Sequence, residues 1–225
     1  MIRTKAETRG IERGAQTRRA TTDDLPTIAR IHKIAYSRSH FTTLLPDDVL
    51  VRYYGYFLDG GSEICLALDG AENSELENRA VGEVHGFAVF GEGIPERITR
   101  FKRECFWDIF FTSLRHPWSA ARKALFVAFA RLAKRPAYPP AAFLLLSIAV
   151  AVPRHGIGSR LLSAVLEAAQ QRGLKTVGLY VNADNVSAIN AYLAAGFRVI
   201  DFQGGQYYME WALERENGKK LFPVY

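Results

Sequence analysis

The chain has 225 residues, of which 48% are hydrophobic, and a net charge of +6 at neutral pH. A chain of this size and composition folds as one globular domain, with or without an insertion, which argues against a disordered or fibrous protein. Its two cysteines, Cys65 and Cys105, are too few for a disulfide framework and fit no metal site, and no apolar run is long enough to span a membrane, so we expect a cytoplasmic protein.

The N-terminal part begins with a polar, charged stretch over residues 1–16, which predicts a disordered basic tail and not a secretory signal. A short strand is expected over residues 18–21. A helix follows with Thr22 or Asp23 as its N-cap, and a second helix lies within residues 44–61, where Gly60 and Gly61 end it. The apolar stripe of the first helix comprises Ile28, Ile31, Ile34 and Ala35. The inward face of the second comprises Val49, Leu50, Tyr53, Tyr54 and Phe57.

The middle of the chain has two strand patterns, over residues 63–69 and 81–93, and then changes character. Residues 94–140 show two amphipathic helical patterns, over about 95–113 and 117–134, that are rich in Phe, Trp and Arg. We interpret this segment as a helical-hairpin insertion between two strands that would otherwise form a β-hairpin.

The C-terminal part alternates strands with helices. Residues 142–150 are apolar throughout, as in a strand buried on both faces, and an amphipathic helix follows over residues 157–172. The next elements are a strand (175–181), a short helix (185–195) and a hairpin around Gly204 and Gly205. This order predicts an α/β (α+β) fold, with a mixed sheet of about six to seven strands flanked by helices. We expect one domain over residues 17–213, with a C-terminal tail over 214–225.

Two motifs carry chemical information. The first is Gly156-Ile157-Gly158, between the apolar strand and its helix, where backbone N–H groups and the helix dipole suit a pyrophosphate. Alone it is weak, because position 161 is Leu161 and not the third glycine of a dinucleotide fingerprint, and no Gly-Lys-Ser/Thr of a P-loop is present. A tight turn without a ligand stays open. The second motif is "NVSAINAYLAAGF", in which Tyr192 lies two helical turns after Asn185; taken alone, this Tyr suggests packing.

Together the two motifs resemble the GCN5-related N-acetyltransferase (GNAT) family. The resemblance covers residues 18–212 without the insertion and depends on the pair: strand, Gly-x-Gly and helix, then "N-x-x-A-x-x-x-Y-x-x-x-G-F" after the next strand. It implies the GNAT fold, N-acetyltransferase activity and acetyl-CoA as cofactor.

The resemblance also implies roles for individual residues. The strand backbone at Ile148, Ala149 and Val150 would pair with the pantetheine arm like an added strand. Asn185 would contact the cofactor near its pantetheine end, and Tyr192 would stand by the sulfur. The N–H groups that would cradle the pyrophosphate belong to Arg154, His155, Gly156, Ile157, Gly158 and Ser159. One departure concerns Pro153, which stands where the family has Gln or Arg, in a loop about two residues short.

Acetyl transfer to an amine requires a base for the amine and a proton for the leaving thiolate. We predict Tyr192 as the general acid, because a Tyr phenol ordinarily titrates only slightly above a thiol. Candidates for the base are Glu83 and His85, which lie two residues apart on an expected strand and so on one face; a structural sheet histidine, a surface carboxylate and a water chain stay open as alternatives.

The acceptor is not identified by the sequence, although we expect an amine-bearing small molecule and no nucleic acid, since no nucleic-acid motif is present. The alternative function is a non-catalytic acetyl-CoA-binding regulatory module of the same fold. The insertion has three interpretations: a wall of the acceptor site, a homodimer surface in place of a monomer, or a basic amphipathic face for an anionic membrane or a phosphate-bearing acceptor.

Overall fold

A computed structural model describes residues 16–36, 40–58, 60–68, 83–118, 121, 140–152 and 156–213. The expected N- and C-terminal tails and most of the expected helix over 117–134 lie outside these residues. No helix in the described ranges is both long and apolar enough to cross a membrane.

The centre of the fold is a seven-stranded sheet with the strand order β1-β2-β3-β4-β5-β7-β6. In the described sheet β4 pairs with β5 in parallel, and the other neighbouring strands are antiparallel. The predicted mixed sheet is therefore confirmed. The strands are β1 (Gln16–Arg19), β2 (Ser62–Leu68), β3 (Val84–Glu92), β4 (Phe143–Val150), β5 (Thr176–Asn182), β6 (Arg198–Gln203) and β7 (Gln206–Ala212).

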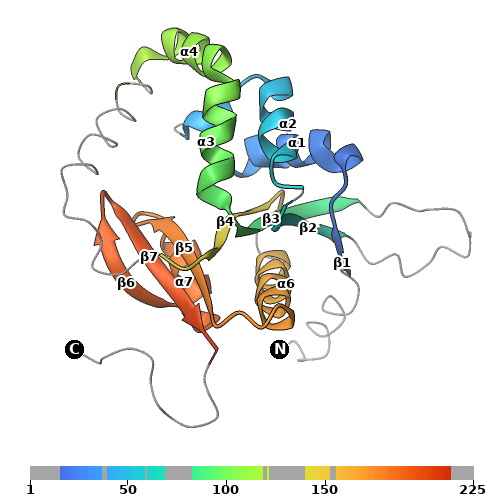
Figure 1. Ribbon diagram of the computed structural model, residues 1–225, viewed down its shortest axis with the longest axis vertical. Coiled ribbons are helices and arrows are strands. Elements are labelled where there is room, and N and C mark those ends of the chain that lie inside the picture. The colour runs from blue at the N-terminus through green and yellow to red at the C-terminus, as the bar shows by residue number, and fades with distance from the viewer. Residues whose placement is uncertain are drawn as a thin grey trace, which may run out of the picture.

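Helices cover both faces of this sheet (Figure 1). On one face α1 (Leu25–Ala35) and α2 (Asp47–Gly55) pack against β2 and β3, while α6 (Ile157–Gln171) and α7 (Val186–Ala194) pack on the other. Because β3 and β4 pair with each other, the segment between them is the predicted insertion. It begins with α3 (Ile94–Glu104) and α4 (Phe106–Arg115), which Figure 1 shows extending away from the sheet.

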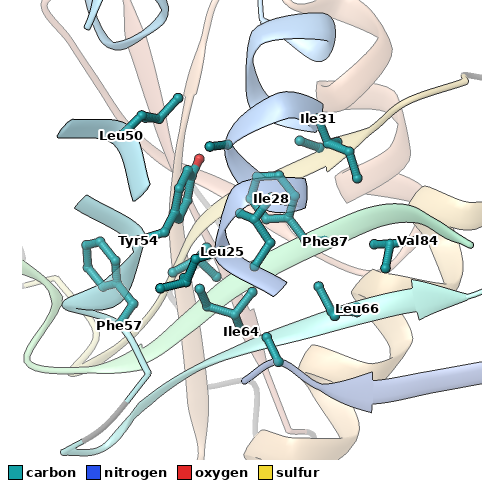
Figure 2. Close-up of a cluster of buried hydrophobic side chains, with 14 of the residues drawn as sticks. Leu25, Ile28, Ile31, Leu50, Tyr54, Phe57, Ile64, Leu66, Val84 and Phe87 are labelled. Carbon is teal, nitrogen blue, oxygen red and sulfur yellow. The ribbon is translucent and has the colours of Figure 1, made fainter. Parts of the chain in front are cut away.

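The core beneath α1 and α2 contains large apolar side chains with no exposed surface (Figure 2). Ile28 of α1, Leu50 of α2 and Phe87 of β3 belong to it, and the ring of Tyr54 stands among them. Burial of this order stabilises a domain by about 1.5–3 kcal/mol for each large apolar side chain. A second core fills the other face, between α6 and the central strands.

The structure differs from the sequence-based expectation in several places. The first strand covers Gln16–Arg19 in place of the expected 18–21, so Gln16 is not part of the expected tail. Ile34, expected in the α1 stripe, is 58% exposed, because two steps of three residues in a helix rotate the side chain about 120° away from Ile28. Ala35, expected in the same stripe, is exposed at the last residue of the helix. The second helix ends at Gly55 and not at Gly60, since glycine weakens a helix interior. The single helix expected over 95–113 is two helices that meet at Cys105.

The start of α1 is also organised differently. A short 3-10 turn over Thr22–Asp24 precedes the helix, and Thr21 forms a capping box with Asp24, in place of the expected N-cap at Thr22 or Asp23. The Asp24 carboxylate also accepts two hydrogen bonds from Arg18, at 2.7 and 2.8 Å, which lower the pKa of Asp24 to about 2. The charged pair thus ties β1 to the first helix.

Candidate active site

The site begins where β4 separates from β5. In the described sheet β4 pairs with β3 as far as Val150, but it pairs with β5 only at Leu144 and Leu145. The register with β3 skips Leu146, so this residue forms a β-bulge between Leu145 and Ser147. Bulges bend a strand and redirect its side chains. Beyond the bulge, the edge of β4 that faces β5 is open to an extended ligand.

The N-terminus of α6 lies at the far end of this opening. Gly156, its N-cap, has a left-handed φ of +71°, and a Cβ added at Gly156 or Gly158 would meet no atom of the described residues within 4 Å. The space above both glycines is therefore open. At Gly86 of β3, in contrast, a Cβ would lie 2.8 Å from the Ala149 carbonyl oxygen and 3.1 Å from Ile157, so this glycine allows α6 to approach the strands closely.

The chemistry of this helix start fits a diphosphate. The first N–H groups of a helix, here those of Ile157, Gly158 and Ser159, have no partner within the helix, and the macrodipole adds partial positive charge. The first turn of α6 contains no acidic residue that would repel an anion. The predicted contacts Arg154 and His155 lie outside the described residues, as does the shortened loop at Pro153.

The second motif forms α7, beside β5. Asn185 is its N-cap, as expected, and its side-chain oxygen accepts a hydrogen bond of 3.2 Å from the Ala188 N–H. Tyr192 packs against the core beneath α6 and α7, with its ring centroid 5.7 Å from that of Phe197. Burial raises the pKa of Tyr192 well above its usual value, and nearby Tyr36 raises it further. The phenol therefore keeps its proton at any pH at which the protein is assayed.

Two further residues, Tyr36 and Ser147, lie at the same opening on the face of the sheet that α1 and α2 cover. Tyr192 lies on the other face, with α6 and α7. The hydroxyls of Tyr36, at the end of α1, and Ser147, beside the bulge of β4, are hydrogen-bonded at 2.6 Å. Tyr36 and Tyr192 interact electrostatically although α1 and α7 cover opposite faces of the sheet. We infer that the two phenols lie near each other on either side of the gap between β4 and β5. Neither Tyr36 nor Ser147 is predicted as a site residue from the sequence, although Ser147 is the one polar residue of the strand "FLLLSIAV".

A buried histidine, His32, lies beside Tyr36. Its Nδ1 is 2.6 Å from the Tyr54 hydroxyl and its Nε2 is 2.9 Å from the Thr42 hydroxyl, so both ring nitrogens are held by hydroxyl groups. Burial, with smaller contributions from His40 and Lys33, lowers the pKa of His32 to about 3. Such a histidine is too weak a base to accept a proton from an ammonium group near pH 7, which indicates a positioning role.

The low pKa of His32 predicts a pH-dependent stability. The unfolded chain protonates this histidine near pH 6.5 and the folded chain does so only near pH 3, so stability falls as the pH drops through this window, by about 1.4 kcal/mol per pH unit. Urea denaturation should show a loss of roughly 2–3 kcal/mol between pH 6.5 and pH 4.5. The low pKa of Asp24 adds its own loss only below about pH 4.

The variant His32→Gln separates this histidine from other acid effects. Glutamine can still hydrogen-bond to the Tyr54 or Thr42 hydroxyl but does not titrate. We expect it to be less stable at pH 7, with a flat stability between pH 6.5 and pH 4.5. An equally steep pH dependence in His32→Gln would show that His32 is not the cause.

The two candidates for the base, Glu83 and His85, lie at the start of β3, and only His85 belongs to the strand. Glu83 precedes the strand and is exposed, and His85 is half-buried, with its carbonyl oxygen accepting a hydrogen bond of 2.7 Å from the Ala151 N–H. Ala151 follows Ser147 by four residues, or about 13 Å of extended chain. The structure thus places both candidates near the α6 end of the opening and does not bring them to Tyr36 and Tyr192.

The comparison with protein families decides between the interpretations of these features. Residues 87–197 match the model of the acetyltransferase (GNAT) family, and this range contains β4, the Gly-x-Gly turn and the whole Tyr192 motif. Residues 87–197 form a GNAT acetyltransferase domain. GNAT acetyltransferases use acetyl-CoA, so the cofactor expected from the sequence is confirmed.

Solved structures agree with this fold. The acetyltransferase-like protein yncA of Salmonella typhimurium, solved with its cofactor acetyl-CoA, is 14% identical with a TM-score of 0.52, and the match covers 93% of this chain and 99% of that one. A ribosomal-protein-alanine N-acetyltransferase of Brucella melitensis is 18% identical with a TM-score of 0.51, covering 88% and 99%. No curated protein matches the chain by sequence. At these identities the structures support the GNAT fold alone.

Proposed function

We propose that this GNAT protein transfers the acetyl group of acetyl-CoA to the amine of a small molecule by direct attack. The observation that carries the proposal is the opening between β4 and β5, which has the free N-terminus of α6 at one end and the phenols of Tyr36 and Tyr192 at the other. A diphosphate and a thioester lie at the two ends of acetyl-CoA, and the opening offers each end a suitable environment.

The cofactor is held mainly by backbone groups in this proposal. The edge of β4 at Ile148, Ala149 and Val150 pairs with the pantetheine arm, and the N–H groups of Gly156 to Ser159 bind the diphosphate. Because backbone N–H groups do this work, the unusual Pro153 does not prevent binding. Asn185 uses its side-chain oxygen to cap α7, and its amide N–H groups stay available for the cofactor.

Tyr192 is the general acid. When bound, acetyl-CoA supplies an acetyl thioester whose sulfur leaves as a thiolate, and the phenol of Tyr192 holds the proton that the sulfur needs. The raised pKa keeps this proton on the phenol until it is required. The same apolar surroundings also raise the pKa of the leaving thiol. The pKa of the phenol therefore stays only slightly above the pKa of the thiol.

The acceptor amine approaches from the face of α1 and α2. The opposite face is covered by α6 and α7, whereas the Tyr36 and Ser147 hydroxyls lie on the α1 side and can orient an amine. Glu83 and His85 remain the proposed bases. Their distance from Tyr36 favours a water chain that carries the proton from the amine along the opening.

An amine panel tests the proposed activity. The purified protein is incubated with acetyl-CoA and separate pools of amino sugars, amino acids, polyamines, aminoglycosides and peptide N-termini, and released thiol is measured. We expect thiol release well above the background hydrolysis with one small-molecule pool. Calorimetric binding of acetyl-CoA without thiol release for any pool would instead support the regulatory module. Absence of binding at millimolar acetyl-CoA would contradict both functions.

A further inference from the structure

The insertion exposes an aromatic surface that the proposed transfer reaction does not use. Five large side chains form one stripe of α4, and we call this stripe the aromatic face. It comprises Phe106, Trp107, Phe110, Phe111 and Leu114. Trp107 is 65% exposed and Phe111 is 55% exposed, and Trp118, three residues after the end of α4, is 85% exposed. Contiguous apolar patches of this kind mark interaction sites on soluble proteins.

The orientation of the aromatic face is fixed by the other side of α4. There Thr112 is buried, Ile109 packs on a cluster that contains Phe101 of α3 and Val49 of α2, and Asp108 forms an ion pair of 2.8 Å with Arg52. The helix therefore buries its less apolar side and presents its rings to solvent. The rings also support one another, with centroids 5.4 to 6.1 Å apart.

Charge identifies the partner. Residues 97–135 contain ten Lys and Arg against two carboxylates, Glu104 and Asp108, while the rest of the chain has 19 Lys and Arg against 21 Asp and Glu. Both carboxylates are already engaged, Glu104 by Arg100 and Asp108 by Arg52. The positive charge of the protein is thus concentrated on the segment that carries the aromatic face. Two copies would repel each other there, whereas an anionic surface would be attracted.

We propose that the aromatic face docks this protein on an anionic lipid bilayer. Trp and Phe side chains favour the boundary between headgroups and acyl chains, and each Lys or Arg near an anionic surface adds about 1 kcal/mol. In this proposal the protein lies on the membrane surface, with the aromatic face of α4 toward the acyl chains. Figure 1 shows α4 at the end of the molecule opposite α6, so docking leaves the diphosphate end of the active site accessible.

Vesicle sedimentation tests the proposal. The full chain is mixed with vesicles of phosphatidylcholine alone, or of phosphatidylcholine with about one third phosphatidylglycerol, at low and high salt. We expect sedimentation with the anionic vesicles, several-fold weaker at about 0.5 M salt, and little with the neutral ones. Tryptophan emission should shift to the blue on binding, because Trp107 and Trp118 are two of the three tryptophans.

Variants assign the binding to the aromatic face. The double variant Trp107→Ser/Phe111→Ser should lose at least about tenfold in vesicle partitioning. The matched control is Phe202→Ser on β6, where the phenylalanine is 56% exposed, and it should bind like the unchanged protein. Both proteins should still unfold cooperatively and bind acetyl-CoA, since all of these side chains are more than half exposed and contact neighbouring surface rings.

Several results would overturn the proposal. Equal binding to neutral and anionic vesicles would indicate unspecific apolar adhesion, and binding to neither would remove the membrane as partner. A dimer in light scattering that dissociates in Trp107→Ser/Phe111→Ser would assign the aromatic face to a second copy of this chain. None of these results depends on acetyl transfer, so the proposed function stands or falls separately.

Discussion

Replacing Tyr192 by phenylalanine should lower turnover at least about tenfold while acetyl-CoA binding is kept. The substitution removes one hydroxyl from a ring that packs beside Phe197, and it leaves the ring and its apolar contacts in place. Without the phenol, the departing sulfur must take its proton from water that enters a largely apolar gap. The measurement is thiol release with the amine that the panel identifies, combined with calorimetry for acetyl-CoA.

A matched control for this variant is Tyr207→Phe. Tyr207 lies on β7 and packs against the same core as Tyr192, so its replacement also removes one phenol from that region. We expect nearly unchanged turnover in Tyr207→Phe. If Tyr192→Phe kept full turnover, the general-acid role would be excluded. If turnover falls, an unchanged affinity for acetyl-CoA shows that the variant has not simply misfolded.

The second large effect is expected at Gly158, where stability and binding should change in opposite directions. In the described structure a Cβ at Gly158 meets no atom within 4 Å, and an aspartate there would lie at the positive end of the helix dipole, so Gly158→Asp should stabilise the fold by about 0.3–1 kcal/mol. Its carboxylate would also occupy the proposed diphosphate site. Like charges about 4 Å apart near a protein surface cost up to about 4 kcal/mol, so acetyl-CoA affinity should fall at least thirtyfold or so.

Two controls separate charge from size and from position. Gly158→Asn has nearly the size of aspartate without its charge and should weaken binding less. Gln170→Glu adds the same charge to an exposed position of α6 twelve residues later, about 18 Å along the helix, and should leave the affinity unchanged. Thermal unfolding and calorimetry measure both quantities. Unaltered affinity in Gly158→Asp would show that the diphosphate binds elsewhere.

Most of the fold could be predicted from the sequence because its signals are local. The apolar strand over 143–150, the Asn185 cap and the glycine turn of the last hairpin each depend on residues that are near one another in the chain. Errors arose where tertiary packing decides. Ile34 continues an apolar pattern but faces away from the core, and Cys105 separates two helices because α3 packs against α2 there.

The candidate site was predictable only in part, for the same reason. The Gly-x-Gly turn and Tyr192 lie in recognisable local motifs, whereas Tyr36 and Ser147 come together from positions 111 residues apart. The bulge at Leu146, which turns Ser147 toward α1, cannot be read from hydrophobic alternation, because all residues of this strand other than Ser147 are apolar. His85 lies on β3 as expected, whereas Glu83 lies just before this strand, and the distance of both from the phenols depends on strand register.

The brief pairing of β4 with β5 also affects how the protein holds together. Only two residue pairs join β4 to β5, and we call this weakly paired boundary the seam. The three strands beyond it, β5, β7 and β6, form a subsheet that is connected to the other four strands mainly through the α6 crossover and side-chain packing. A ligand that pairs with β4 as an extra strand would occupy the seam and stabilise the position of the subsheet of β5, β7 and β6. Occupancy by the coenzyme would then contribute to the mechanical integrity of the sheet as well as to catalysis.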